Sequence, residues 1–573
     1  MSDSSLPTDV KDVESLRNDL LAYLLAERDF TQAEIDSHAT LPREAKTDLG
    51  LLVPLAVVAE VWDGRITVSA SDNNTKLRPG DAVSVIDPSG QRRKRKGVVV
   101  ENRIDSLELE IGGRWSVGDI VDVAVEEAVC LEPFIKQVSA ISPGLPGARF
   151  LSILGGFSGP SASGFGGLSG EEAATFVPAC FDAGQAASCR LAFARPPVAC
   201  IQGCPGCGKT QVLAAVARGF AVSGKEVLVV ALTHQAVNNA LNKIAASDPS
   251  VRTVKIGDEF RTEGLERNVE SFRSFRDYLA SRSRGSRRCG DVVGMTLVSA
   301  MINIGMIASG FLPTIVLVDE AGQIPLAHAA AIGSFGCGSV VFFGDVAQMP
   351  PIYRPEQEHD ELTQSVMERI VALYPNLCPA LSMTYRMNEE ITDLVGRTFY
   401  RPRGIRLESA ASVRGRRSRC GGIPLLSDNR SLVLAAAERS PEATDSNAAE
   451  ADAVTELVRD ILSDGIKVGD VAIVTPYRRQ VKAIRERLKD LLSGERIPLV
   501  DTVERLQGQD VEMIVLSFAS EDPGWISVQR EFLFDRNRLN VMVSRAKTKV
   551  VVFCGERIGN ELASIFQLKR KDG

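Results

Sequence analysis

The chain has 573 residues, enough for roughly three to five domains, and its 44% hydrophobic and 24% charged residues are typical of globular proteins. A net charge of −7 excludes a generally basic nucleic-acid binder, but it is compatible with a motor that carries a local basic groove. Eleven scattered cysteines favour a reducing, cytoplasmic location. The polar N-terminus and the lack of an apolar run of roughly 18 residues exclude secreted and membrane classes, so we expect no membrane partner.

The N-terminal part combines one helix with short β-rich runs. Residues 12–29 place leucines at helical spacing, which predicts a helix within an N-terminal segment of residues 1–45. Residues 46–130 hold about six short β-rich runs separated by turn residues, which predicts a small β-barrel. Its basic turn, residues 92–96, suits either a solvated hairpin tip or a nucleic-acid contact. Both alternatives remain open at this stage.

The rest of the chain has the pattern of an α/β protein. Residues 131–174 are rich in Gly, Ser and Pro around 143–170, which predicts a linker or mobile loop. After it, buried strands alternate with helical stretches, so we expect mainly parallel sheets with helices on both faces. We divide this part into two domains, residues 175–380 and 381–573, and place a charged insertion near residues 255–290.

A phosphate-binding loop is the strongest motif. The stretch GCPGCGKT fits G-x-x-x-x-G-K-[ST] and lies between a strand-like and a helical segment. Its glycines let backbone N–H groups surround phosphate oxygens, and we expect Lys209 to neutralise the β- and γ-phosphates and the Thr210 hydroxyl to bind Mg²⁺. The predicted nucleotide contacts in this loop are Gly203, Cys204, Pro205, Gly206, Cys207, Gly208, Lys209 and Thr210.

Two later segments supply candidate catalytic groups. The apolar run TIVLV ends in Asp319 and Glu320. An Asp at a strand tip can hold Mg²⁺, and the adjacent Glu can take a proton from the attacking water. In the run VVFFGDVAQ, Gln348 could sense the γ-phosphate or position water. We therefore predict a nucleoside triphosphatase.

Together with later motifs in the chain, these motifs resemble those of a known family. GCPGCGKT, VDEAGQ and GDVAQMPP are followed by TYRMNEEI, VERLQGQDVEMIVLS and RLNVMVSRAK. This series resembles superfamily 1 helicases, in particular the branch of the nonsense-mediated-decay helicase. The residues Lys209, Asp319, Asp345, Arg386, Gln507 and Arg545 follow one another at spacings of 110, 26, 41, 121 and 38. The resemblance implies two tandem RecA-like domains in an α/β fold, with ATP and Mg²⁺ bound between them.

The resemblance also assigns residues outside the phosphate loop. It implies that Gln185 reads adenine, that Tyr385 stacks on the base, and that Arg386 and Arg545 from the second domain clamp the γ-phosphate. Arginine suits this role because its planar fork binds phosphate through two hydrogen bonds. The remaining nucleotide positions that it implies are Gly508 and Asp510, the latter standing where the family has a Glu that contacts the ribose.

The nucleic-acid contacts also come from the resemblance. They are Thr233, Asn238 and Thr296 in the first domain, and Pro476, Tyr477, Gln480 and Thr502 in the second. Short polar groups at strand ends can hold a phosphate backbone without reading bases. Local caps and turns are the competing explanation at each position.

The resemblance implies an ATP-dependent translocase or helicase on single-stranded DNA or RNA, moving 5′→3′. An ATP-gated clamp or a ribonucleoprotein-remodelling subunit is the alternative. Two departures stand out in the motifs, since Cys204 and Cys207 replace the Pro and Thr that are usual in the loop. We expect no fused nuclease in the residues before the motor, so any cutting would need a partner, and a regulatory subunit is a second possible partner.

Overall fold

The structure is a computed structural model. It describes residues 12–70, 73, 75, 77–89, 94–103, 106–160, 167–282, 289–354, 362–418, 422–423, 425–427, 430–492, 496–506 and 510–568. Gln507 and Gly508 of the predicted site therefore lie outside the described residues, as do residues 92–93 of the basic turn. Within the described part, no helix is both long enough and apolar enough to span a membrane.

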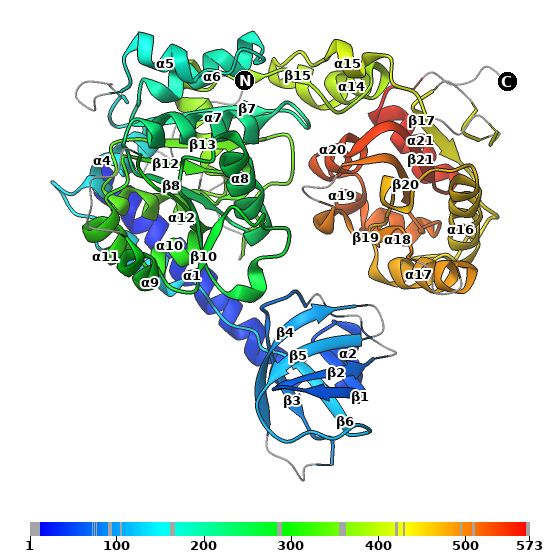
Figure 1. Cartoon of the computed structure of the whole chain (residues 1–573). Coiled ribbons are helices and arrows are strands. Elements are labelled where there is room, and N and C mark those ends of the chain that lie inside the picture. The colour runs from blue at the N-terminus through cyan, green and yellow to red at the C-terminus, as the bar shows by residue number, and fades with distance from the viewer. Residues whose placement is uncertain are drawn as a thin grey trace.

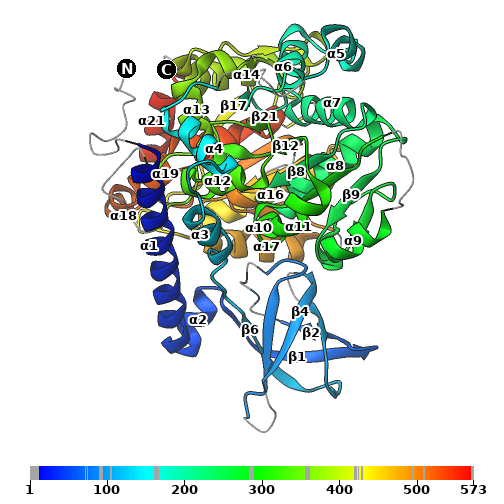
Figure 2. The same ribbon diagram turned by 90° about the vertical axis from the view of Figure 1, so that its left-hand side faces the viewer.

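The N-terminal helix joins the barrel to the first α/β lobe. Helix α1 (Val13–Thr40) begins behind Asp12, whose carboxylate accepts a hydrogen bond from the Ser15 N–H at 2.8 Å. Its leucines, including Leu16 and Leu20, are buried against the first lobe. Figure 2 shows α1 running along that lobe to the short helix α2 (Arg43–Asp48) beside the barrel.

The six predicted strands form a closed antiparallel barrel, as expected. The strand order is β1-β2-β5-β4-β3-β6. The strands are β1 (Leu52–Trp62), β2 (Arg65–Ser69), β3 (Ala82–Ile86), β4 (Arg95–Asn102), β5 (Ser106–Ile111) and β6 (Ile120–Val125). Alternate side chains such as Val53, Val68 and Val85 fill the interior. Figure 1 places this barrel below the two lobes.

The segment expected to be a linker is largely helical. It contains α3 (Glu132–Ser139), α4 (Pro146–Gly155) and α5 (Gly170–Phe176). Helix α4 buries Phe150, Leu151 and Leu154, so the expectation of an unpacked linker is wrong there. The buried guanidinium of Arg369 donates hydrogen bonds to the carbonyls of Leu154 and Gly155, which caps the end of the helix.

The first α/β lobe contains an eight-stranded parallel sheet covered by helices. Its strand order is β10-β9-β11-β8-β12-β13-β7-β14, and the two strands at one end, β9 and β10, lie at the start of and within the insertion predicted near residues 255–290. The strands are β7 (Val198–Gly203), β8 (Val227–Ala231), β9 (Thr253–Ile256), β10 (Glu270–Phe272), β11 (Val292–Thr296), β12 (Ile315–Val318), β13 (Val340–Gly344) and β14 (Ala380–Leu381). The helices are α6 (Ala183–Phe193), α7 (Lys209–Val222), α8 (His234–Ser247), α9 (Phe275–Ser281), α10 (Leu297–Ile302), α11 (Ile304–Met306), α12 (Leu326–Ala330) and α13 (Val366–Leu373).

The second lobe contains a five-stranded parallel sheet of order β17-β21-β20-β18-β19, with a small pair β15-β16 beside it. The strands are β15 (Met383–Thr384), β16 (Glu408–Ser409), β17 (Leu432–Ala435), β18 (Val471–Val474), β19 (Leu499–Asp501), β20 (Val511–Ser517) and β21 (Ala546–Phe553). The helices are α14 (Glu389–Val395), α15 (Ala411–Arg414), α16 (Ala448–Ser463), α17 (Arg478–Leu492), α18 (Pro523–Val528), α19 (Arg530–Leu533), α20 (Arg536–Ser544) and α21 (Glu556–Ile565). The fold is thus α/β with two parallel sheets, an N-terminal helix and a β-barrel, as predicted.

Candidate active site

The phosphate loop connects β7 to α7 and needs glycine at two positions. Gly206 and Gly208 have φ angles of +73° and +82°, a region that other residues rarely adopt. A Cβ atom at Gly206 would lie 2.4 Å from the Cβ of Arg386, and one at Gly208 would lie 2.6 Å from Nε2 of Gln185. The loop therefore packs directly against a second-lobe arginine and the predicted adenine-reading glutamine.

Lys209 begins α7 and turns back over the loop. Its ammonium donates a hydrogen bond to the Gly203 carbonyl at 2.8 Å. Burial alone would lower the pKa of Lys209, but the negative charges nearby, among them Asp345 and Glu320, outweigh burial and raise this pKa. Lys209 is therefore positively charged at neutral pH, as a phosphate ligand must be.

The two predicted acids directly follow β12. Burial, followed by the charge of Glu320, raises the pKa of Asp319 to about 7. One Asp319 oxygen accepts a hydrogen bond from the Glu320 N–H at 2.9 Å. Glu320 has a φ of +54°, a strained conformation for a residue with a Cβ and one that clusters at functional sites. A cation beside Asp319 would relieve the burial of its charge, so the position fits a Mg²⁺ site.

Two arginines of the second lobe converge on this site. Arg386 donates to the Ser544 carbonyl at 3.0 Å and pairs with Asp510 at 2.5 Å, and Arg545 donates to the Gln348 side chain at 2.9 Å. Burial, then the neighbouring charge of Arg386, lowers the pKa of Arg545 to about 10, which leaves it charged at neutral pH. Among the described residues, Nε of both arginines has no hydrogen-bond partner. Two close guanidinium groups with unused donors suit a phosphate group.

The predicted adenine contacts lie together beside the loop. The Gln185 amide donates to the Cys207 carbonyl at 3.0 Å and accepts from the Asp182 N–H at 3.2 Å. The Tyr385 hydroxyl donates to the Asp182 carboxylate at 3.0 Å, and the residue is 39% exposed. Tyr385 thus presents a partly free face, whereas the Gln185 amide is bonded within the chain. Asp510, predicted to contact ribose, is paired with Arg386.

The predicted nucleic-acid contacts fall into two groups. Thr233 and Thr296 cap helices α8 and α10 at the ends of the paired strands β8 and β11. Pro476 and Thr502, the latter directly after β19, are half-buried in the second lobe. These positions lie at the carboxyl ends of strands, where parallel-sheet proteins bind their ligands.

The other three predicted contacts are engaged inside the protein. Asn238 is buried, donates to the carbonyls of Arg261 and Glu263, and accepts from Lys255. Gln480 is buried, and its amide bonds with Asn447 and Ser517. The Tyr477 hydroxyl accepts from Ser520 and from the Trp525 indole. In this structure their polar atoms position neighbouring segments of the chain.

One residue of the site, Tyr400, carries no signal in the sequence motifs. Asp345, at the end of β13, accepts a hydrogen bond from the Tyr400 hydroxyl, and Asn540 donates to the Ala347 carbonyl. Asn540 lies within the RLNVMVSRAK motif, but Tyr400 lies outside the motifs from which we predicted the site. Only the packing of the two lobes brings these side chains together.

Comparisons with known proteins agree with the motifs. Two AAA domain models match the chain, one over residues 181–365 and the other over residues 362–557. A DNA replication ATP-dependent helicase/nuclease of Schizosaccharomyces pombe is 25% identical over 402 residues, 65% of this chain and 28% of that protein. An uncharacterized ATP-dependent helicase of Methanocaldococcus jannaschii is 28% identical over 263 residues, 43% of this chain and 36% of that protein.

The chain thus spans only 28% to 36% of the length of these two relatives. Among solved structures, the DNA complex of arterivirus nonstructural protein 10, a helicase, gives a TM-score of 0.39 at 12% identity, covering 92% of this chain and 83% of that one. That similarity is too weak to bear on the assignment. The AAA domain matches, the related helicases and the series of six motifs support a superfamily 1 helicase.

Proposed function

We propose that this protein hydrolyses ATP between its two lobes and uses the resulting movement to translocate along single-stranded nucleic acid or to unwind a duplex. The observation that carries the proposal is the position of Arg386 and Arg545. Both come from the second lobe: Arg386 packs against Gly206 of the phosphate loop, and Arg545 donates to Gln348 and lies within the influence of the Glu320 charge. A γ-phosphate held from both sides makes hydrolysis depend on the arrangement of the lobes.

In this proposal each side chain has one task. Lys209, Arg386 and Arg545 neutralise the phosphates. Glu320 takes the proton from the attacking water, and Gln348 orients that water or the γ-phosphate. Tyr385 stacks on the adenine, with Gln185 beside it. Binding of ATP places the charge of the γ-phosphate between the arginines and draws the lobes together, and hydrolysis removes it and lets them separate. This movement would carry the protein along the nucleic-acid strand.

Magnesium belongs to the same proposal. Thr210 and Asp319 would hold the ion, which neutralises phosphate charge when bound. In the described part of the chain, no three His, Cys, Asp or Glu side chains are grouped as a metal site. A Mg²⁺ ion that shares its ligands with water and phosphate oxygens needs only one or two protein groups.

The proposal also covers the type of nucleic acid and the direction of movement along it. Thr233, Thr296, Pro476 and Thr502 provide small polar or half-buried groups at strand ends, which suit contacts to a phosphate backbone. DNA is the first substrate to test, because the relative from S. pombe is described as a DNA replication helicase/nuclease. The direction 5′→3′ follows from the branch of the family that the motifs resemble.

The test is steady-state ATPase activity with matched single-stranded DNA and RNA, followed by strand displacement on duplexes with a 5′ or a 3′ tail. We expect ATPase stimulation by at least one nucleic acid and displacement of the 5′-tailed duplex. Stimulation without displacement on either tail would exclude unwinding and leave translocation alone or the ATP-gated clamp. An ATPase rate that no nucleic acid changes would contradict the proposal.

A further inference from the structure

Asp345 is a buried carboxylate that both lobes supply with hydrogen-bond donors. One oxygen accepts from the Gln202 amide at 2.8 Å and from the Ala347 N–H at 3.0 Å. The other accepts from the Gln348 amide at 2.6 Å and from the Tyr400 hydroxyl at 2.5 Å. Three of these donors belong to the first lobe, and only the Tyr400 hydroxyl belongs to the second.

The Tyr400 hydroxyl is held so that its proton is directed to Asp345. It ends a π-helical turn, Gly396–Tyr400, which directly follows α14, and its side chain is fully buried. Its oxygen accepts a hydrogen bond from the Asn540 amide at 3.1 Å, and Asn540 also donates to the Ala347 carbonyl at 2.7 Å. Burial, and then the charge of Asp345, raises the pKa of Tyr400 well above its ordinary value, so the hydroxyl keeps its proton.

The same carboxylate is connected to the catalytic arginine. Gln348 donates to Asp345 through its amide nitrogen, and its amide oxygen accepts from Arg545 at 2.9 Å. A continuous series of hydrogen bonds therefore leaves the second lobe at Tyr400, passes through Asp345 and Gln348 of the first, and returns to the second at Arg545. A buried charge that loses a donor is destabilised. Separating the lobes at Tyr400 would remove one of the four donors to Asp345.

We propose that Tyr400, supported by Asn540, is a positioning residue that fastens the second lobe to Asp345 and thereby aligns Gln348 and Arg545 for hydrolysis. This inference rests on the proposed ATPase function. It predicts that the Tyr400 hydroxyl affects the rate of the chemical step rather than the binding of ATP. Tyr400 itself touches neither phosphate nor water in this scheme.

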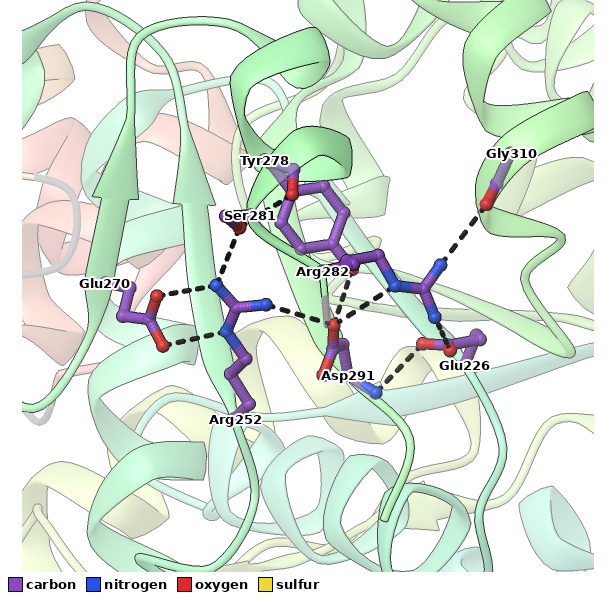
Figure 3. Close-up of polar contacts among 8 residues, drawn as sticks. All are labelled: Glu226, Arg252, Glu270, Tyr278, Ser281, Arg282, Asp291 and Gly310. Atoms are coloured by element: carbon purple, nitrogen blue, oxygen red, sulfur yellow. Dashed lines mark hydrogen bonds and ion pairs between the residues drawn. The ribbon is translucent and has the colours of Figure 1, made fainter. Parts of the chain in front are cut away.

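The decisive variant is Tyr400→Phe, which removes the hydroxyl and keeps the ring. Tyr278→Phe is a matched control, because Tyr278 is also fully buried and donates to a buried carboxylate, that of Asp291, at 2.8 Å. In Figure 3 this pair lies in a cluster with Arg252 and Arg282, and all four residues belong to the first lobe. The control thus removes an equivalent hydrogen bond that does not join the two lobes.

We expect Tyr400→Phe to lower kcat of the nucleic-acid-stimulated ATPase by about 10- to 100-fold, the loss typical of a hydrogen bond to a charged group, with KM for ATP within about 3-fold of wild type. Tyr278→Phe should lower thermal stability and leave kcat unchanged. Wild-type kcat in Tyr400→Phe, or equal loss of kcat in both variants, would overturn the inference. A wild-type protein without ATPase activity would overturn the proposed function as well.

A double-mutant cycle provides a second readout that does not depend on one variant alone. Gln348→Ala should lower kcat in the wild-type background and have a clearly smaller effect in the Tyr400→Phe background, because the glutamine is already misaligned there. If Tyr400→Phe does not fold, the same cycle is run with Asn540→Ala. Additive effects of the two substitutions on kcat would show that Tyr400 or Asn540 does not act through Gln348.

Discussion

Glu320 owes its place in the site to an unusual backbone conformation. Its φ of +54° turns the chain directly after the buried Asp319, at the end of β12. We predict that Glu320→Gln, which keeps the shape and removes the base, lowers kcat by about 10²- to 10⁴-fold, the range for loss of general-base catalysis. Mg·ATP affinity, measured with a fluorescent ATP analogue, should stay near wild type.

The variant Lys209→Ala is the comparison for Glu320→Gln, since it should lose nucleotide affinity as well as turnover. Turnover of Glu320→Gln close to wild type would show that another group activates the water. The two variants together separate binding of the phosphates from the chemical step.

We predict that Cys207 makes the phosphate loop sensitive to thiol reagents. Its side chain is buried, and although burial tends to raise the pKa of its thiol, a hydrogen bond with Cys204 and the charge of Lys209 outweigh burial and lower that pKa. We predict that a maleimide labels the exposed Cys130 and Cys180 first without loss of ATPase, and Cys207 more slowly with loss of ATPase. Labelling is followed by mass spectrometry beside the turnover assay.

Bound Mg·ATP should protect Cys207, and Cys207→Thr should be active and resistant to inactivation. Full activity after stoichiometric labelling of Cys207 would refute the prediction. Inactivation that persists in Cys207→Thr would assign the effect to another cysteine.

The residues of the site could be predicted from sequence to the extent that a contiguous motif contains them. The phosphate loop and the two acids that follow β12 lie in such motifs, and the structure places them side by side. Tyr400 could not be predicted, because its partner Asp345 is 55 residues away and in the other lobe. The partners of Asn238 lie 17 to 25 residues away and those of Gln480 lie 33 to 37 residues away, outside their motifs, so a motif alone presents the two side chains as free contacts.

Among the secondary-structure elements, α1 docks on the first lobe through an incompletely satisfied polar contact. Glu27 faces His328 at 3.9 Å, and the His328 ring packs edge-on against Phe134 at 4.7 Å between centroids. One Glu27 oxygen and Nδ1 of His328 have no hydrogen-bond partner among the described residues. Burial raises the pKa of Glu27 from 4.5 to about 7 and lowers the pKa of His328 to about 4. Burial therefore favours the protonated, neutral form of Glu27 and the deprotonated, neutral form of His328.

This docking should depend on pH through Glu27. Because the folded pKa is above the unfolded value of 4.5, the folded state binds the extra proton, and stability is lost as pH rises from about 4.5 through 7. We predict that Glu27→Gln raises the free energy of unfolding by about 1–3 kcal/mol at pH 8 and changes it little at pH 4.5. Thermal or urea unfolding at the two pH values measures this.

Glu14→Gln on the same helix is the control, because Glu14 is exposed and only paired with Arg17 at 3.4 Å. It should change stability little at either pH. A Glu27→Gln variant that is destabilised at pH 8 would show that the ionised carboxylate is needed there, for example beside Arg354.

Helices and strands could be predicted where the local composition and the hydrophobic periodicity indicate the same type of element. The barrel strands and the buried parallel strands follow from their β-rich runs. Helix α4 was missed because glycine, proline and serine dominate its surroundings, although its own apolar side chains fill a space between α1 and the first lobe. Strands β9 and β10 were missed because charged residues surround them. Their end of the sheet is held by the ion pairs of Arg252 with Glu270 and Asp291.

For the whole molecule, the second lobe contacts the first at the phosphate loop and at Gln348, while the barrel contacts the first lobe elsewhere. Arg261 of the first lobe pairs with Asp81 of the barrel at 2.7 Å, and the Arg261 carbonyl accepts a hydrogen bond from Asn238. The second lobe meets the first through Arg545 and Gln348. Parallel α/β lobes could be predicted from the alternation of elements, but these contacts depend on packing between distant segments.

The central claim is that the second lobe supplies groups that act on the γ-phosphate, and Arg545→Ala tests it most directly. The control is Arg439→Ala in the same lobe, where both partners of the ion pair with Glu556 are exposed. We measure kcat and KM for ATP with saturating single-stranded DNA or RNA. We predict that Arg545→Ala lowers kcat by about 10³-fold or more with a much smaller change in nucleotide affinity, and that Arg439→Ala behaves as wild type. An Arg545→Ala variant that keeps wild-type kcat would contradict hydrolysis between the two lobes.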